Sequence, residues 1–174
     1  VERQCTRLES LLNDFLRLTR LNRLELVAGS LNALLEQVLD FFEADAQHRN
    51  VEIVRYLDGD LPIIKMDKQT LQAALQNMVK NSMEAMSDGG QLMVRTRMMR
   101  SGVAVDLIDT GQGIGTSTLI KMFEPFYTTK DSGSGLGLPM AKKVIEAHGG
   151  VINVQSEEGR GTQFTIEFPI PKRL

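Results

Sequence analysis

The chain has 174 residues and a mass of 19.4 kDa, enough for one domain of ordinary size with an appendage. Its net charge of −2 gives no drive toward nucleic acid or an anionic membrane surface, and its single cysteine excludes an internal disulfide framework. No apolar run approaches the roughly 20 residues that a membrane-spanning helix needs. We therefore expect a cytoplasmic protein with no nucleic-acid partner and no membrane contact of its own.

The first predicted element is a helix over residues 1–21. Its apolar positions form two series with a spacing of seven residues, which together make a heptad seam. One series is Val1, Leu8 and Phe15, and the other is Cys5 and Leu12, with Thr19 completing it. Three heptads leave two interpretations open: a seam between helices or chains, or an amphipathic helix that packs on its own domain. Because the chain starts inside this pattern, we expect it to be part of a longer protein whose remainder could be membrane-anchored.

Alternating helix and strand signals follow. We expect a loop over 25–30, a helix over 31–49 capped by Ser30, a strand over 50–57, a turn over 58–62 and a second strand over 63–66. The longest helix then runs over 68–86 behind an Asp67 cap. Its apolar stripe consists of Leu71, Ala74, Leu75, Met78, Val79, Ser82 and Met86.

The second half reads as two hairpins separated by helices. Strands over 91–100 and 103–109 form the first hairpin, and strands over 151–157 and 162–170 form the second. Between them lie a short helix over 119–123 and a helix that ends at Gly149 as a left-handed cap. Hairpins plus helices, without strict strand–helix alternation, predict an α+β two-layer sandwich. Its helices would cover one face of a mixed, mainly antiparallel sheet behind the N-terminal helix.

Asn77, Asn81 and Glu84 share one polar stripe of the longest helix, because they are spaced i, i+4 and i+7. Asn is a mediocre helix former, so two of them one turn apart suggest that their side-chain oxygens are needed. Amide and carboxylate oxygens suit Mg²⁺. A solvated helix face remains the alternative.

Two glycine-rich stretches follow. In "DTGQGIG", Asp109 ends an apolar strand, and glycines at 111, 113 and 115 permit a sharply turned backbone that a flat ligand can approach. The carboxylate could accept a hydrogen bond from the exocyclic amine of adenine; the alternative is a glycine-rich turn with a solvated aspartate. "TTKDSGSGLGLPM" opens into a helix, which favours a phosphate cradle under a movable lid or, alternatively, a flexible surface loop.

The order of these motifs resembles the catalytic, ATP-binding domain of two-component sensor histidine kinases, within the gyrase, heat-shock chaperone, histidine kinase and MutL superfamily. The matching stretches are the N box "NMVKNSMEAM", the first glycine box "DTGQGIG", the F box "FEPFYTTK", the second glycine box "GSGLGL" and a terminal "GRGT". The resemblance spans roughly residues 30–169 and implies a Bergerat-type sandwich that binds ATP or ADP with Mg²⁺.

The resemblance also implies roles for individual residues. Asn81 would ligate Mg²⁺ with help from Asn77, Asp109 would recognise adenine, and Lys130 would contact the terminal phosphates. Asn77, Asn81 and Lys130 are therefore the expected catalytic residues. The other expected nucleotide contacts are Lys80, Gly111, Gly113, Gly133, Gly135, Leu136, Gly137, Leu138 and Thr162.

Two features depart from the family pattern. Glu84 stands where many members carry a phosphate-binding cation, so Lys80 or Lys130 would have to supply that charge. Neither His48 nor His148 has the acidic neighbour of a phosphoacceptor histidine.

Residues 1–24 resemble the second helix of a dimerisation and phosphoacceptor hairpin, and residues 25–174 resemble the catalytic domain. We therefore expect a kinase domain that cannot phosphorylate itself alone, with the histidine domain of the parent protein, a response regulator and a second copy of the chain as partners. A clamp-type ATPase and a non-catalytic nucleotide-binding scaffold are the alternatives.

Overall fold

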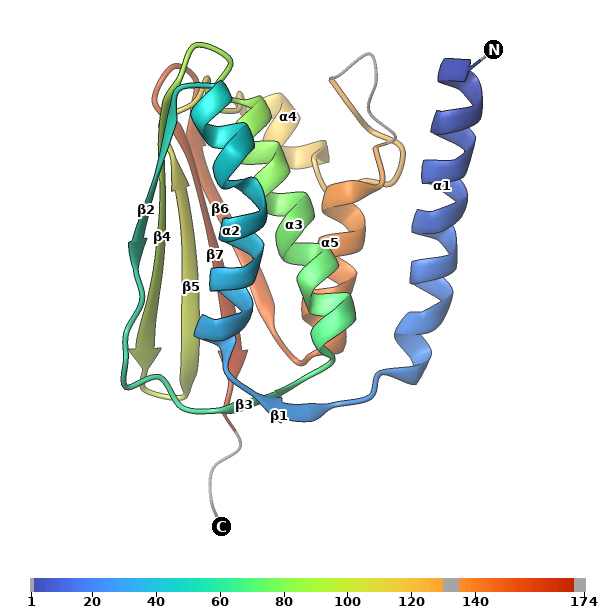
Figure 1. The fold of residues 1–174 in the computed structure, drawn as a ribbon. Helices are drawn as coiled ribbons and strands as arrows, with labels where there is room; N and C mark the ends of the chain where they lie inside the picture. The colour runs from blue at the N-terminus through green and yellow to red at the C-terminus, as the bar shows by residue number, and fades with distance from the viewer. Residues whose placement is uncertain (1, 130–134, 171–174) are drawn as a thin grey trace.

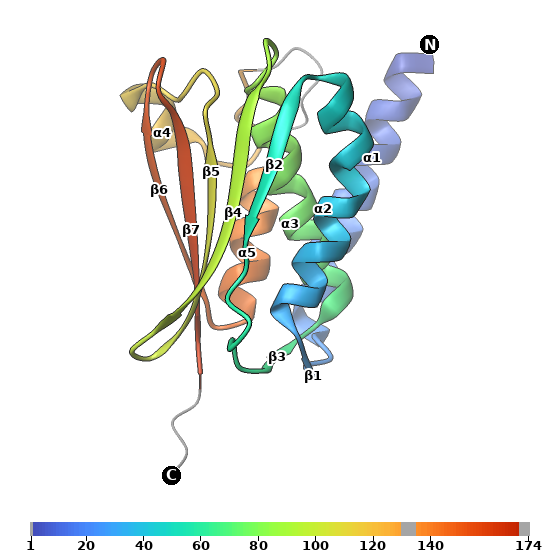
Figure 2. The same cartoon turned by 60° about the vertical axis from the view of Figure 1, so that its left-hand side comes forward.

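The computed structural model describes residues 2–129 and 135–170, and it has two layers (Figures 1 and 2). The helices are α1 (Glu2–Arg20), the 3-10 turn η1 (Leu21–Arg23), α2 (Leu31–His48), α3 (Lys68–Glu84), α4 (Thr116–Lys121) and α5 (Gly137–Ala147). The strands are β1 (Val27–Gly29), β2 (Val51–Tyr56), β3 (Ile64–Met66), β4 (Gly90–Met99), β5 (Gly102–Asp109), β6 (Val151–Glu157) and β7 (Gly161–Pro169).

The main sheet has five strands in the order β2-β4-β5-β7-β6. β2 runs parallel to β4, and the remaining pairs are antiparallel. Helices α2, α3 and α5 cover one face of this sheet, and no helix among the described residues covers the other face (Figure 2). The predicted α+β sandwich with a mixed, mainly antiparallel sheet is confirmed.

Both predicted helix caps form. The Ser30 hydroxyl accepts from the backbone N–H of Ala33 at 3.2 Å, and the Asp67 carboxylate accepts from that of Thr70 at 3.1 Å. Such caps satisfy backbone donors that the first helical turn leaves unpaired. The short helix lies a few residues earlier than expected, because the carbonyl of Gly115 already accepts from Leu119 N–H at 2.9 Å.

The loop expected over residues 25–30 is wrong. Val27–Gly29 is a short strand that pairs antiparallel with β3 in a separate two-stranded sheet, with Val27 opposite Met66. Three residues are too few to show an alternating pattern, and their partner lies almost forty positions along the chain. The pairing therefore depends on tertiary contacts that local sequence does not report.

The core lies between the sheet and the three covering helices. Leu75 and Met78 of α3 and Leu107 of β5 are fully buried. Burying a side chain of this size contributes about 1.5–3 kcal/mol relative to exposure. This packing fixes α3 and α5 side by side on the sheet, with the carboxyl end of α3 and the first turn of α5 at the same end of the molecule (Figure 1).

A histidine ties the opposite ends of these two helices together. The Nε2 atom of His148, at the end of α5, accepts from the backbone N–H of Asp67, the cap of α3, at 3.0 Å. Its Nδ1 atom lies 2.7 Å from the carbonyl oxygen of Val144, so the tautomer that fits carries its proton on Nδ1. The Asp67 carboxylate also accepts from the backbone N–H of Glu25, which joins the linker after α1 to the same point.

Helix α1 stands beside α5, outside the two layers (Figure 1). The seam residues Leu8, Leu12 and Phe15 are exposed by 65%, 58% and 60%. The seam therefore does not pack on the rest of this chain. Of the two interpretations of the heptad pattern, packing on the chain's own domain is the one that this arrangement excludes.

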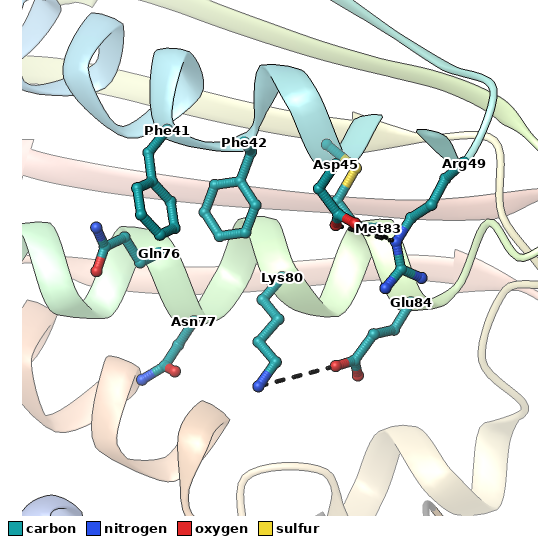
Figure 3. A pocket seen from close by; sticks show the side chains of 9 residues that line it. All are labelled: Phe41, Phe42, Asp45, Arg49, Gln76, Asn77, Lys80, Met83 and Glu84. Carbon is teal, nitrogen blue, oxygen red and sulfur yellow. Dashed lines mark hydrogen bonds and ion pairs between the residues drawn. The ribbon is translucent and has the colours of Figure 1, made fainter. Parts of the chain in front are cut away.

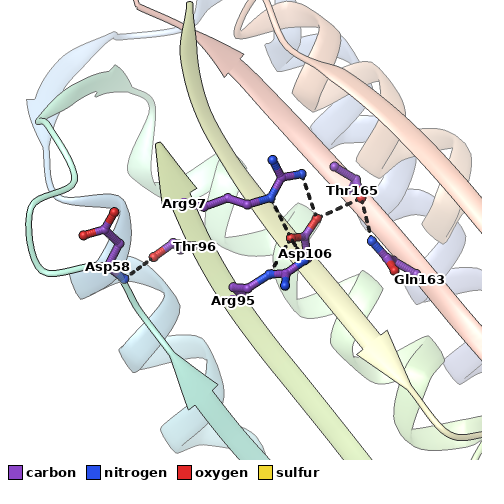
Figure 4. Close-up of polar contacts among 7 residues, drawn as sticks. All are labelled: Asp58, Arg95, Thr96, Arg97, Asp106, Gln163 and Thr165. Atoms are coloured by element: carbon purple, nitrogen blue, oxygen red, sulfur yellow. Dashed lines mark hydrogen bonds and ion pairs between the residues drawn. The ribbon is translucent and has the colours of Figure 1, made fainter. Parts of the chain in front are cut away.

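The uncovered face of the sheet carries one buried charge. The Asp106 carboxylate accepts from Arg95 Nε at 2.9 Å, from Arg97 Nε at 3.0 Å and from the Thr165 hydroxyl at 2.9 Å (Figure 4). Burial alone would raise the pKa of Asp106, but the bonds from Arg97, Arg95 and Thr165 outweigh it and hold that pKa below its ordinary value.

Candidate functional site

The candidate site is built around Asp109, the last residue of β5. The Asp109 side chain is on the inner face of the sheet and is 3% exposed, and Thr162 of β7 is its register partner. One carboxylate oxygen accepts from the backbone N–H of Gly111 at 2.9 Å. Burial raises the pKa of Asp109, although the polar groups of Gly111, Ser82 and Thr162 beside the carboxyl oppose that rise. The expected neighbourhood of Asp109 and Thr162 is present.

The glycines of the first glycine box are required by contacts within the chain. A Cβ on Gly111 would lie 2.6 Å from the carbonyl oxygen of Ala85, at the end of α3. A Cβ on Gly113, whose φ is +73°, would lie 2.0 Å from the carbonyl oxygen of Glu157. These glycines therefore let the loop after Asp109 pack directly against α3 and against the β6–β7 turn. From the sequence, we expected the glycines to leave the backbone open for a flat ligand. That interpretation did not anticipate their packing against α3 and the β6–β7 turn.

The N box supplies the polar side of the site from α3. Asn77, Lys80 and Glu84 extend from α3 on the side away from α2 (Figure 3). Lys80 Nζ lies 4.0 Å from Glu84 Oε1, so the two side chains form an i, i+4 ion pair on the same face of α3. A surface cavity of about 350 Å³ adjoins this face, and Asp109 does not line it. Its lining residues are Phe41, Phe42, Asp45, Arg49, Gln76, Asn77, Lys80, Met83 and Glu84.

The first turn of α5 faces Asn77. A Cβ on Gly137 would lie 3.7 Å from the side-chain amide of Asn77, so the absence of a side chain leaves space between the two helices. The N-cap residue of α5, Leu136, has an apolar side chain that makes no capping hydrogen bond, in contrast to Ser30 and Asp67 at the starts of α2 and α3. Backbone N–H groups at an uncapped helix start, together with the helix dipole, favour an anion.

The two ends of the lid segment, residues 123–137, are held together by backbone contacts. The N–H of Phe126 donates to the carbonyl of Gly135 at 2.9 Å, and a Cβ on Gly135 would lie 2.4 Å from the backbone of Phe126. Gly135 has a φ of +72°, which glycine adopts at no steric cost. Leu136 is buried, and Leu138 packs against the hydrophobic core. Both leucines thus have a structural role beside the nucleotide contact expected of them.

Asn81 lies on α3, and Gly135, Leu136 and Leu138 lie at or just before the start of α5. The other expected residues fall into three groups. Asp109, Gly111 and Thr162 lie together, and Gly113 packs against the turn beyond them. Asn77 and Gly137 face each other, with Lys80 on the next turn of α3. Lys130 and Gly133 are outside the residues that the structure describes.

Sequence reasoning missed Ser82. Its hydroxyl oxygen is buried next to the Asp109 carboxyl, on the inner side of α3. The sequence does carry a signal for Ser82, because it is the polar residue in an otherwise apolar stripe of α3. In the sequence analysis, Ser82 is part of that stripe and is given no role. Phe41, Asp45 and Arg49 of α2 were also missed, and their approach to the N box is a tertiary contact that has no local sequence signal.

Residues 2–129 and 135–170 contain no group of three or more His, Cys, Asp or Glu side chains that could hold a metal ion. No helix in these ranges combines the length and the apolar character needed to cross a bilayer.

The sandwich, the inner-face aspartate and the uncapped glycine-rich helix start define the class of a nucleotide-binding domain. Comparison with known proteins agrees. The family described as "Histidine kinase-, DNA gyrase B-, and HSP90-like ATPase" matches residues 66–172. The chain is 33% identical over 168 residues to the sensor histidine kinase ZraS of Escherichia coli K12, and the match covers 97% of the chain but 36% of ZraS.

Solved structures give the same answer. The catalytic domain of the histidine kinase ThkA, in a nucleotide-free form, superposes with a TM-score of 0.76 at 32% identity and covers 84% of this chain and 96% of that domain. Full-length ShkA in complex with AMPPNP superposes with a TM-score of 0.83 at 30% identity, over 93% of this chain and 35% of ShkA. ThkA in complex with the response regulator TrrA gives a TM-score of 0.81 at 28% identity, over 98% of this chain and 50% of that chain.

The chain belongs to the family of histidine kinase-, DNA gyrase B- and HSP90-like ATPases. Within that family it is an ATP-binding catalytic domain of the sensor histidine kinase type.

Proposed function

We propose that this domain binds Mg-ATP between α3 and α5 and delivers the γ-phosphoryl group to a histidine that is not part of this chain. The observation that carries the proposal is the pairing of Asn77 with the uncapped first turn of α5 across Gly137. An amide oxygen and the positive end of the α5 helix dipole at this point suit a metal-bound triphosphate. ShkA, whose fold this chain shares, was crystallised with an ATP analogue.

The residues present fit a magnesium ion. Asn77 and Asn81 are one helical turn apart on α3, and their side-chain oxygens are hard donors of the kind that Mg²⁺ accepts while keeping several waters. Asn81 would hold the ion, and Asn77 would assist. The ion would neutralise charge on the phosphates; Lys80, held beside Glu84, would add a positive charge on the same face.

The adenine base would pair with Asp109. A nearly buried carboxylate without a positively charged partner among the described residues is costly to keep in a folded protein, so such groups cluster at functional sites. Its remaining lone pair would accept from the exocyclic amine of adenine. Gly111 holds the carboxylate through its backbone N–H group, and Thr162 is the register partner of Asp109 on β7.

Kinase chemistry is favoured over ATP hydrolysis by Asn77. The clamp-type ATPases that the sequence resembles place a glutamate at this position to activate water, and asparagine cannot act as a general base. Phosphoryl transfer to an imidazole does not need that base, since catalysis rests on positioning and charge neutralisation.

The phosphoacceptor would be supplied from outside this chain. His148 is engaged through both ring nitrogens, and His48 has no acidic neighbour in sequence. We assign residues 1–24 to the second helix of a dimerisation and phosphoacceptor hairpin and residues 25–174 to the catalytic domain. The exposed seam of α1 would pack against the first helix of that hairpin and against a second copy of the chain. A response regulator would receive the phosphoryl group in the cytoplasm, and ThkA, a structural relative, has been crystallised with one.

Calorimetric titration tests the nucleotide site. We expect the wild type to bind ADP and ATP with micromolar dissociation constants that depend on Mg²⁺, and we expect Asp109→Ala to lose this binding because the adenine amine loses its acceptor. Asp106→Ala, three residues earlier on the same strand but on the opposite face, is the matched control and should bind as the wild type does. If the wild type bound neither nucleotide, this proposal would be wrong, and a scaffold without a working nucleotide site would replace it.

Sedimentation tests the role of α1. The seam should support a weak dimer, because Leu8, Leu12 and Phe15 are exposed and α1 offers only a single short helix for the contact. Replacing Leu8 and Leu12 by glutamate should leave a monomer without changing ADP affinity. A wild-type chain that stays monomeric at high micromolar concentration would contradict dimerisation through α1.

A further inference from the structure

Ser82 carries a buried polar atom that the fold does not use. Ser82 is 1% exposed, and its Oγ atom is the one buried side-chain oxygen or nitrogen of the described residues without a hydrogen-bond partner. Native proteins pair nearly all buried polar groups, and an unpaired hydroxyl costs stability. A residue that lowers the stability of the free protein calls for a reason.

The position of Ser82 supplies that reason. The C-terminal turn of α3 packs onto the first glycine box, where Gln112 N–H donates to the carbonyl of Ala85 at 3.0 Å. The same packing brings the Ser82 hydroxyl against the Asp109 carboxyl, close enough to influence its ionisation. The two groups do not form a hydrogen bond in the free protein, because Ser82 Oγ has no partner among the described residues. The hydroxyl is therefore poised next to the group that would recognise the base.

We propose that Ser82 is a specificity residue for the purine base, whose hydroxyl donates to Asp109 when a 6-amino purine is bound. This inference rests on the nucleotide-binding function proposed above. A carboxylate has about four acceptor positions. The backbone N–H of Gly111 occupies one of them, and the backbone of Thr162, the register partner of Asp109, lies beside a second. Ser82 would fill a third and leave one for the base. The last acceptor position can accept a hydrogen bond from the exocyclic amine of a 6-amino purine. It cannot bond the oxygen of a 6-oxo purine, because both atoms are acceptors.

The effect of removing the hydroxyl distinguishes this role from a structural one. In Ser82→Ala, the free protein loses an unpaired buried hydroxyl, so its melting temperature should stay the same or rise. ADP should bind about tenfold more weakly, because a hydrogen bond to a charged group is lost in its complex. IDP, whose 6-oxo group cannot use the carboxylate in this way, should lose less affinity, and the ratio of the two affinities should fall.

The experiment is a calorimetric titration of ADP and IDP, with Mg²⁺, against the wild type, Ser82→Ala and Ser82→Cys, together with thermal unfolding of each protein without nucleotide. Ser82→Cys keeps the volume with a weaker donor and should fall between the other two. Thr70→Ala is the matched control: it removes from the same helix a hydroxyl that already bonds, to the carbonyl of Asp67 at 3.2 Å. That control should lower the melting temperature and leave the ADP to IDP ratio unchanged.

Each outcome decides between the explanations. A wild type that binds ADP, with both Ser82 variants keeping the wild-type ADP to IDP ratio, would overturn the role of Ser82 and leave the proposed function intact. Variants that melt earlier and lose both nucleotides equally would assign Ser82 to the structure instead. A wild type that binds neither nucleotide would overturn the proposed function, and this inference with it.

Discussion

Asp106 and Asp109 stand three residues apart on β5, so their side chains point to opposite faces of the sheet. Both are nearly inaccessible to solvent. On the outer face, Asp106 is paired with two arginines and a threonine hydroxyl (Figure 4), and its pKa is lowered. On the inner face, Asp109 receives hydrogen bonds but no ion pair among the described residues, and burial raises its pKa.

The difference teaches how one strand can serve structure and function at once. A buried charge that is fully paired supports the fold, whereas one that lacks its counter-ion is costly unless something else uses it. The outer-face cluster explains how the uncovered side of the sheet tolerates a buried aspartate. The inner-face aspartate has no ion pair among the described residues, and the proposed adenine contact would use its carboxylate.

The largest expected effect concerns the packing that buries Asp109. In Gly113→Ala, the new Cβ would lie 2.0 Å from the carbonyl oxygen of Glu157 at a φ of +73°. The strain and the forced backbone shift should together lower the free energy of unfolding by more than about 4 kcal/mol. Urea denaturation measures it. Gly159→Ala, at a φ of +79° with nothing within 4 Å, is the control and should cost only about 1–2 kcal/mol. Equal losses in the two variants would contradict the packing role of the first glycine box.

Removal of the outer-face charge should come next. Asp106→Ala deletes hydrogen bonds from Arg95, Arg97 and Thr165, and the half-exposed arginines can rehydrate. We expect a loss of about 2–3 kcal/mol in the free energy of unfolding, with ADP affinity unchanged. Chemical denaturation and calorimetry on the same protein check both parts. A variant that keeps its stability but loses ADP would reverse the roles assigned to the two faces.

The pH dependence of stability should separate the two aspartates by sign. The lowered pKa of Asp106 stabilises the fold above the ordinary aspartate pKa of about 3.9, and this contribution is lost as the pH falls through the lower, folded-state pKa. The raised pKa of Asp109 acts oppositely, because the folded state gains stability as the pH falls through that raised value. Urea unfolding between pH 7 and 3 should show a smaller acid loss in Asp106→Asn than in the wild type. An identical slope would show that the cluster does not control acid stability.

The smallest expected effect is a gain. Asp109→Asn removes a buried charge while keeping an oxygen that can accept from the backbone N–H of Gly111. Its free energy of unfolding at pH 7 should rise, because burial disfavours the charged form of Asp109 and asparagine has no charge to bury, while ADP binding is lost. Thermal unfolding and calorimetry give both readings. A destabilised Asp109→Asn would mean that the charge supports the fold rather than a ligand.

Much of the fold was predictable from local signals. Ser30 and Asp67 predicted the starts of α2 and α3, and both side chains form the expected caps. The hairpins were readable from alternating residues and their turns, and Gly149 ends the last helix at a φ of +75°. The strand β1 was not readable, because its three residues acquire their conformation only by pairing with β3.

The candidate site was predictable in content but not in arrangement. The motifs named Asp109, Asn77 and the glycines, because each motif is contiguous in sequence. The sequence did not reveal that Gly113 is required by Glu157, or that the hydroxyl of Ser82 meets Asp109. Both contacts join segments that are far apart along the chain.

The sequence by itself determined which elements form and which side chains with hydrogen-bonding and metal-binding chemistry lie on them, because caps, periodicities and motifs act over a few residues. Only the tertiary structure decided which aspartate is neutralised and which is left for a ligand. Charge pairing and burial depend on what the neighbouring strands and helices bring within about 4 Å. In the sequence, Asp106 and Asp109 are two aspartates on the same strand with no local signal that distinguishes their roles. In the folded sheet, Arg95 and Arg97 form ion pairs with Asp106 and not with Asp109.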